Sequence, residues 1–216
     1  MATVYELHPE TPQMRRVEMI RDALRNGAVM LYPTDTVYAI GCDLNVRSAV
    51  ERVRKIKQIS SDKPLTFLCS SLSSISEYAH VSDSAYRLIR RLIPGPYTFI
   101  LPATKLVPRL VMSPRRKTTG IRVPDHVVCQ ALLQALGNPI VSTSAPTAAQ
   151  LEDERISHAE LFDQLDRMVD IIIDGELPIG YQVSTILDLT EDEPTVIRKG
   201  LGWDAVADWV PEAEMR

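Results

Sequence analysis

The sequence predicts an α/β fold in which a twisted, mixed parallel and antiparallel sheet is flanked by helices. Apolar stretches rich in β-branched residues alternate along the chain with stretches of helical periodicity. Closely spaced strand-like pairs near both ends indicate some antiparallel neighbours. No repeat of about 20 to 50 residues appears. With 216 residues, 45% of them hydrophobic and 24% charged, the composition is that of one ordinary globular domain.

Helices are predicted where apolar residues recur three or four positions apart. The stretch 16–26 has its apolar residues on one face and is followed by Gly27, a common helix stop. The segment 148–160 is polar and aperiodic, and we expect it to be a mobile loop or lid. Three further stretches share the helical pattern: 49–56, 86–92 and 127–136.

Strands are predicted where apolar and β-branched residues run together between turn residues. The first two, 28–32 and 37–42, are separated by the turn-like segment Pro33–Thr36. Nearly continuous apolar strands of this kind are covered by helices in α/β sheets. The remaining predicted strands are 65–69, 97–101, 118–123, 139–142, 168–173, 184–189 and 195–198.

Charge is unevenly distributed along the chain. The formal net charge is −4, yet no acidic residue lies between Asp83 and Asp125, a segment that holds nine of the 24 Lys and Arg residues. The remaining parts of the chain therefore carry 15 basic and all 28 acidic residues. Such asymmetry predicts an electrostatically defined binding face. The acidic stretch 152–193 is interpreted as a solvated surface.

Two parts of the basic segment are interpreted differently. Arg87, Arg90 and Arg91 are spaced as a solvated helix face that needs no partner. The stretch 105–117 has no carboxylate, and crowded like charges repel one another unless an anion relieves them. We therefore predict that it contacts an RNA backbone, with these residues: Arg109, Arg115, Arg116 and Lys117.

Several classes of protein are excluded. No apolar run approaches the roughly 18 residues that cross a bilayer, so we expect no membrane partner. The segment 1–10 has neither the cationic start nor the apolar core of a signal peptide. Three widely separated cysteines and four scattered histidines lack the spacing of a zinc site. We therefore expect a cytoplasmic protein without a protein-ligated metal.

Polar turns at strand ends are the candidate functional features. The chain contains neither a GxxxxGK(S/T) P-loop nor a GxGxxG turn. The turns offer hydroxyls, backbone amides and cations with few carboxylates, which suits an anionic ligand such as a nucleotide. Because ligands of open α/β sheets lie at strand ends, we expect the turns to converge on one pocket. They are 34–36, 57 with 63–65, 94–98, 122–124, 142–144, 184–185 and 198–200.

The order and spacing of these motifs resemble the YrdC/YciO family, and most closely its YciO branch. The resemblance predicts a YrdC-like domain over residues 12–205, with 1–11 and 206–216 as terminal extensions. It also implies a basic concave surface for double-stranded RNA or tRNA. The branch is indicated by His8–Gln13 and Arg115–Thr118. The motifs shared with the whole family are Tyr32–Gly41, Lys63-Pro64-Leu65, Pro94–Thr98, Arg122-Val123-Pro124, Ser184-Thr185 with Asp188-Leu189, and Arg198 with Gly200.

For catalytic members, the resemblance implies synthesis of L-threonylcarbamoyladenylate from L-threonine, bicarbonate and ATP, for tRNA modification. An ATP- or AMP-type nucleotide is the implied ligand, and Mg²⁺ would be carried with it. By position, the implied catalytic residues are Lys57, Arg122 and Ser144. The implied substrate-binding residues are Thr34, Tyr38, Thr98 and Ser184. The implied nucleotide-binding residues are Lys57, Lys63, Ser142, Ser144 and Arg198.

Each of these residues also has a purely structural interpretation. Thr34 can fix a turn, Tyr38 can pack in the core, and Arg122 can pair with Asp125. The ordered succession of the motifs favours the joint functional interpretation.

The sequence departs from the catalytic members at two triplets. The family's KxR is Lys57-Gln58-Ile59 here, and its SxN is Ser144-Ala145-Pro146. Isoleucine has no donor for a phosphate oxygen, and proline lacks both a side-chain amide and a backbone N–H. Two lost contacts of about 1.5 to 3 kcal/mol each predict inefficient adenylate synthesis. The alternatives are a non-synthase RNA-binding paralogue, or a hydrolase of threonylcarbamoyl-AMP or a related adenylate.

Overall fold

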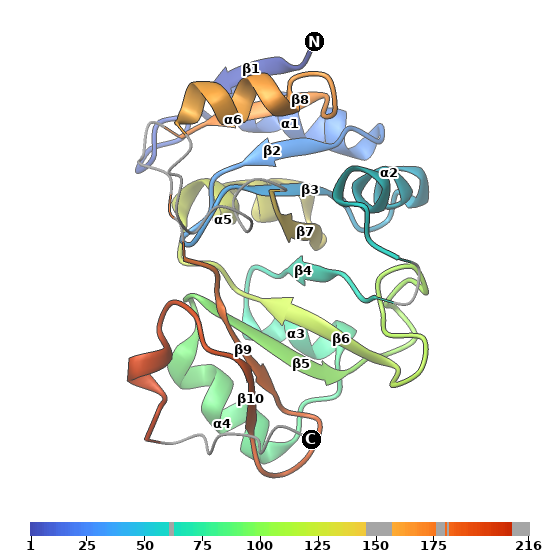
Figure 1. Cartoon of the computed structure of the whole chain (residues 1–216), viewed down its shortest axis with the longest axis vertical. Coiled ribbons are helices and arrows are strands. Elements are labelled where there is room, and N and C mark those ends of the chain that lie inside the picture. The colour runs from blue at the N-terminus through green and yellow to red at the C-terminus, as the bar shows by residue number, and fades with distance from the viewer. Residues whose placement is uncertain (61–62, 146–156, 176–179, 181, 209–216) are drawn as a thin grey trace.

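One mixed sheet of ten strands organises the molecule. The computed structural model describes residues 1–60, 63–145, 157–175, 180 and 182–208. The strands are β1 (Thr3–Glu6), β2 (Met30–Tyr32), β3 (Ala39–Asp43), β4 (Thr66–Leu68), β5 (Tyr97–Pro102), β6 (Thr118–Arg122), β7 (Ile140–Ser144), β8 (Ile171–Asp174), β9 (Thr185–Asp188) and β10 (Thr195–Arg198). They stack along the long axis in the order β1-β8-β2-β3-β7-β4-β6-β5-β9-β10 (Figure 1).

The sheet is mixed, as the sequence predicts. The close pairs β2–β3 and β9–β10 are antiparallel. Parallel pairing joins β1 to β8, β2 to β8, β4 to β6 and β5 to β9. The predicted α/β class is therefore confirmed, and each predicted strand is found within a few residues of its expected bounds.

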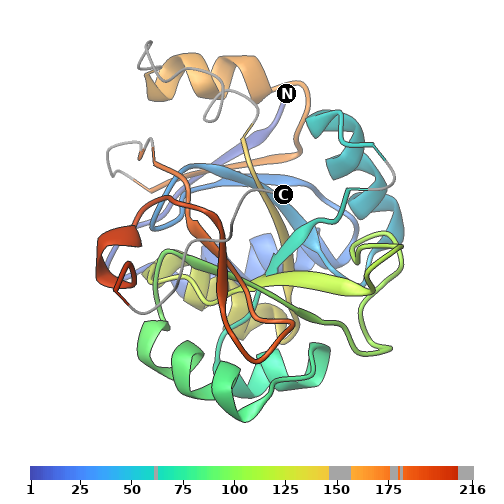
Figure 2. The same ribbon diagram turned by 60° about the horizontal axis from the view of Figure 1, so that its bottom comes forward.

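Helices cover both faces of this sheet. They are α1 (Met14–Arg25), α2 (Arg47–Lys57), α3 (Leu72–Tyr78), α4 (Asp83–Leu92), α5 (Val127–Leu136) and α6 (His158–Leu165). Met30 and Tyr32 pack with the apolar residues of α1 and α5, whereas Leu31 between them packs with those of α2, α3, α4 and α6. This alternation follows from the two-residue period of a strand. Figure 2 shows α3 and α4 together at the bottom of that view.

Helix ends follow the expected signals. Gly27 and Gly137 both have positive φ, at 93° and 77°, which is the left-handed conformation that glycine adopts after a helix. Arg87, Arg90 and Arg91 are exposed on α4, as predicted for a solvated face.

One strand and two α-helices were not expected. The segment 1–11, predicted to be an extension, contributes β1, which pairs with β8 at the edge of the sheet. The seven-residue helix α3 is capped by Ser71, whose hydroxyl accepts the Ser74 N–H. The predicted loop 148–160 is wrong at its end, because α6 begins at His158 behind a Ser157–Glu160 capping box. Residues 148–156 of that loop lie outside the described residues.

Candidate functional site

The predicted polar turns converge on one cavity of about 170 Å³, here called the central cavity. Ala39 and Leu68 line this cavity, and both also pack in the core cluster that contains the apolar residues of α1 and α5. The cavity therefore lies on the same face of the sheet as these two helices, which cover the part of that face nearer β1. Its floor comes from the ends of strands that are neighbours in the sheet. Seven predicted site residues line it: Thr34, Thr98, Arg122, Ser142, Ser144, Ser184 and Arg198.

Arg122 lies in the cavity wall at the end of β6 and is held by the turn between β2 and β3. Its guanidinium forms an ion pair of 2.6 Å with Asp35 and donates to Thr36 Oγ1 at 2.9 Å. Both charged side chains are nearly buried, with 8% and 11% exposed. The alternative Arg122–Asp125 pair is wrong: Asp125 instead donates its backbone N–H to the second Asp35 oxygen at 3.1 Å. Arg122 is therefore fixed in place with its charge largely offset.

Thr34 both lines the cavity and fixes the turn. Its hydroxyl donates to the Val37 carbonyl at 2.7 Å and accepts the Thr36 N–H at 3.2 Å. Hydroxyl-to-backbone bonds of this kind stabilise turns. The structural role expected for Thr34 is observed, and it holds Thr36 against Arg122.

Arg198 approaches the cavity from β10, and its partners among the described residues are neutral. Its guanidinium donates to the Ser184 carbonyl at 2.8 and 3.1 Å and to Ser184 Oγ at 3.2 Å. Ser184 Oγ in turn lies 2.9 Å from Thr98 Oγ1. Burial, and then the positive charge of Arg122, lowers the pKa of Arg198. None of the ion pairs among the described residues includes Arg198, so its charge faces the cavity without a carboxylate.

Lys57 and Ile59 border the same cavity at the end of α2. Lys57 does not line it, but its Nζ lies 3.3 Å from Ser144 Oγ and 3.4 Å from the Ala145 carbonyl oxygen. Partial burial lowers the pKa of Lys57. Ile59 lines the cavity and presents hydrocarbon where the family's arginine is expected. Pro146, the other altered position, lies outside the described residues.

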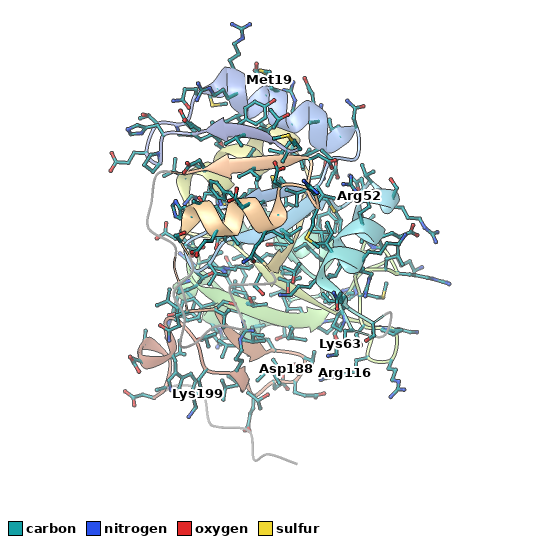
Figure 3. The ribbon with its side chains drawn as sticks, turned by 45° about the horizontal axis from the view of Figure 1, so that its top comes forward. Met19, Arg52, Lys63, Arg116, Asp188 and Lys199 are labelled. Atoms are coloured by element: carbon teal, nitrogen blue, oxygen red, sulfur yellow. The ribbon has the colours of Figure 1, made fainter. Side chains whose placement is uncertain are left out.

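Tyr38 and Lys63 are not among the residues that line the central cavity. The Tyr38 ring packs edge-on against the rings of His158 and Phe162, with centroid separations of 5.5 and 5.8 Å. Its hydroxyl accepts the Gly175 N–H at 3.4 Å, and burial raises the pKa of Tyr38 to about 12. Lys63 is exposed near the start of β4 (Figure 3). For Tyr38, the structure shows the core packing that we considered as the alternative.

One cation of the stretch 105–117 is neutralised by a carboxylate from another part of the chain. Arg116 donates to Asp188 on β9 at 2.9 Å, and Figure 3 shows the two side chains together. Arg116, which the sequence predicts to contact an RNA backbone, is therefore paired within the protein. Arg109, Arg115 and Lys117 are exposed and form no ion pair with another described residue.

Sequence reasoning missed part of the lining. Thr66 adds a polar group to the cavity, and Val183 and Ile186 add apolar surface. The two-residue alternation of the strands could have indicated Thr66. Thr66 and Ser142 are direct partners across β4 and β7 and therefore point to the same face of the sheet. Among the described residues, no cluster of His, Cys, Asp or Glu is suited to a metal ion, and no helix is long and apolar enough to cross a membrane.

Comparisons with known proteins identify the family. The family model for Sua5, YciO and YrdC, described as telomere recombination, matches residues 22–200. The YciO protein of Escherichia coli K12 is 41% identical over 202 residues, which cover 94% of this chain and 97% of that protein. The threonylcarbamoyl-AMP synthase of Vibrio vulnificus is 32% identical over 187 residues, covering 85% and 98% of the two chains.

Solved structures agree with this assignment. The crystal structure of E. coli YciO superposes with a TM-score of 0.85 at 40% identity, over 94% of this chain and 97% of that chain. The crystal structure of P. abyssi Sua5 complexed with L-threonine gives 0.86 at 25% identity, over 100% of this chain and 63% of that chain. Sequence motifs, fold and comparisons therefore coincide, and the chain belongs to the Sua5/YciO/YrdC family.

Proposed function

We propose that the central cavity binds an adenylate, with threonylcarbamoyl-AMP as the preferred ligand and its phosphate between Arg122 and Arg198. The observation that carries the proposal is the charge of Arg198. Among the described residues its guanidinium contacts only neutral groups, and burial and then the charge of Arg122 lower its pKa. An anion relieves this repulsion and gains charge-assisted hydrogen bonds. The synthase that resembles this chain supports the choice of adenylate.

The remaining lining suits the other parts of such a ligand. Hydroxyls of Thr34, Ser142 and Ser144 offer hydrogen bonds to a threonyl or ribose group, and Leu65, Leu68 and Ile186 offer apolar contact to a base. No carboxylate is among the described residues that line the cavity. A magnesium ion would therefore be held by the nucleotide phosphates rather than by acidic side chains, and ATP would bind with its own metal.

Calorimetric titration of the full chain with threonylcarbamoyl-AMP, AMP and Mg-ATP tests this proposal. Threonylcarbamoyl-AMP should bind most tightly, and Arg198→Met should weaken it about tenfold to a hundredfold, because a hydrogen bond to a charged group contributes about 1.5 to 3 kcal/mol. Arg91→Met on the exposed face of α4 removes the same charge far from the ligand and should bind as the unmodified protein does. Equal affinities for the Arg198 variant and the unmodified protein would contradict the proposal.

A second candidate function is contact with the backbone of double-stranded RNA or tRNA through Arg109, Arg115 and Lys117. Their exposure without an ion-pair partner among the described residues favours it. Phosphate contacts of this kind release counterions and make affinity fall steeply with salt. Arg116 is left out because it is engaged with Asp188.

Filter-binding titrations with a tRNA at several salt concentrations test this second function. Arg115→Glu should weaken binding several-fold and reduce the dependence on salt, because a phosphate contact is replaced by a repulsive charge. Arg87→Glu makes the same change of net charge on the solvated face of α4 and should have little effect. If both variants weaken binding equally, only the overall charge matters and the predicted contact is wrong.

A further inference from the structure

A second cavity lies at a point of the sheet where the chain direction favours ligand binding. Strands β4 and β6 are parallel neighbours. The helix after β4, α3, packs in the core cluster of one sheet face, whereas the helix after β6, α5, packs in the cluster of the other face. Where connections from adjacent parallel strands leave toward opposite faces, a crevice opens at their carboxyl ends, and ligands of α/β proteins bind in such crevices.

The crevice holds a cavity of about 430 Å³, here called the switch-point cavity. It shares no lining residue with the central cavity. Its walls are mainly aliphatic, from Leu72, Ile93, Pro94 and Val127. The polar groups that line it come from the two strand ends and from the start of α5, and they include Ser70, Ser71 and His126.

His126 has buried hydrogen-bonding groups without partners. Its side chain lines the switch-point cavity, only 9% of the residue is exposed, and neither ring nitrogen has a partner among the described residues. Buried polar groups in native proteins are normally hydrogen-bonded, so an orphaned pair requires an explanation. Burial lowers the pKa of His126, which keeps the ring neutral with one N–H donor and one acceptor.

The start of α5 also has no side-chain cap. His126 is the N-cap residue of this ten-residue helix, its side chain makes no capping bond, and the first turn contains no acidic residue. The first amide groups of a helix and its positive dipole end attract an anion. One negative charge fits better than two, because the walls are largely aliphatic and Asp125 already contributes a carboxylate to the lining.

We propose that the switch-point cavity binds a small monocarboxylate with an aliphatic body. Its carboxylate accepts hydrogen bonds from the first amides of α5 and from the ring N–H of His126. Its aliphatic body lies against Leu72, Ile93 and Pro94. This site is separate from the adenylate site and does not depend on it.

NMR titration of the uniformly ¹⁵N-labelled full chain with isovalerate tests the proposal, with the neutral isostere isovaleramide as the ligand control. Isovalerate should shift the amides of residues 70–72 and 126–130 saturably, and isovaleramide should bind more weakly. Val127→Asp places a like charge beside the carboxylate and should weaken isovalerate binding about tenfold relative to the isosteric Val127→Asn. Val127 is 47% exposed, so both variants should fold.

A third variant, His126→Phe, removes both ring nitrogens while keeping a ring of similar size. It should also weaken isovalerate binding, with the α5 amide spectrum otherwise retained. The proposal is overturned if isovalerate causes no saturable shifts, or if the shifts centre on residues 142–144 and 184 of the central cavity. Equal affinities of the Val127→Asp and Val127→Asn proteins, or unchanged binding by the His126→Phe protein, would overturn it as well.

Discussion

An Arg122→Met variant should lose about 3 to 5 kcal/mol of unfolding free energy, the usual result of removing one partner of a buried ion pair. The methionine leaves the Asp35 carboxylate, only 11% exposed, without its guanidinium partner. It also removes the bond that Arg122 donates to Thr36, so the turn between β2 and β3 loses its anchor to β6. Adenylate binding should weaken about tenfold to a hundredfold, as for Arg198→Met, because the phosphate loses one of its two arginines. Urea denaturation and calorimetry measure the two effects.

The double variant Asp35→Asn with Arg122→Met separates stability from binding. Removing both charges should recover much of the lost stability, since replacing a buried ion pair by neutral groups is often close to neutral. It should not recover binding, because no cation is restored at the end of β6. A double variant as unstable as Arg122→Met alone would show that the hydrogen bonds to Thr36 and Gly95, rather than the charge of Asp35, dominate the cost.

The sequence predicted the sheet well because its strands carry strong local signals. Runs such as Ile171–Ile173 are buried on both faces, so apolar content alone reveals them. The edge strand β1 shows the limit, since three of its four residues are exposed and only pairing with β8 makes it a strand. Helix α6 was missed although its Ser157–Glu160 capping box is a sequence signal, because the polar residues before it masked the start.

The candidate site was predictable to the extent that it is built from strand-end turns. Hydroxyls and arginines at such turns come together whenever the strands are neighbours, as β7, β4, β6, β5 and β9 are. The ion-pair partner of Arg122 was not predictable from the sequence. Asp35 and Asp125 are both plausible partners, and only the fold brings Asp35 to the guanidinium. The same holds for Asp188, which is distant in sequence from Arg116 and meets it through the register of β9.

Ile59→Arg should raise pyrophosphate release from ATP, threonine and bicarbonate by about tenfold to a hundredfold, the range expected for one charged phosphate contact. The backbone at this position is already defined, since the Ile59 N–H donates to the Arg54 carbonyl at 3.0 Å and Gln58 adopts the left-handed conformation that closes α2. Ile59 lines the central cavity, so an arginine at this position should also reach the cavity. Adding Pro146→Asn should increase the rate further, beyond either single variant.

Ile59→Lys is the matched control for this gain. Lysine brings the same charge without the planar fork that binds two phosphate oxygens, so it should give a smaller increase than arginine.

Formation of AMP from threonylcarbamoyl-AMP, measured on the same variants, distinguishes a repaired synthase from a hydrolase, because a hydrolase should be active without the substitutions. If the protein with both Ile59→Arg and Pro146→Asn releases no more pyrophosphate than the unmodified chain, catalysis is limited by other residues of the cavity.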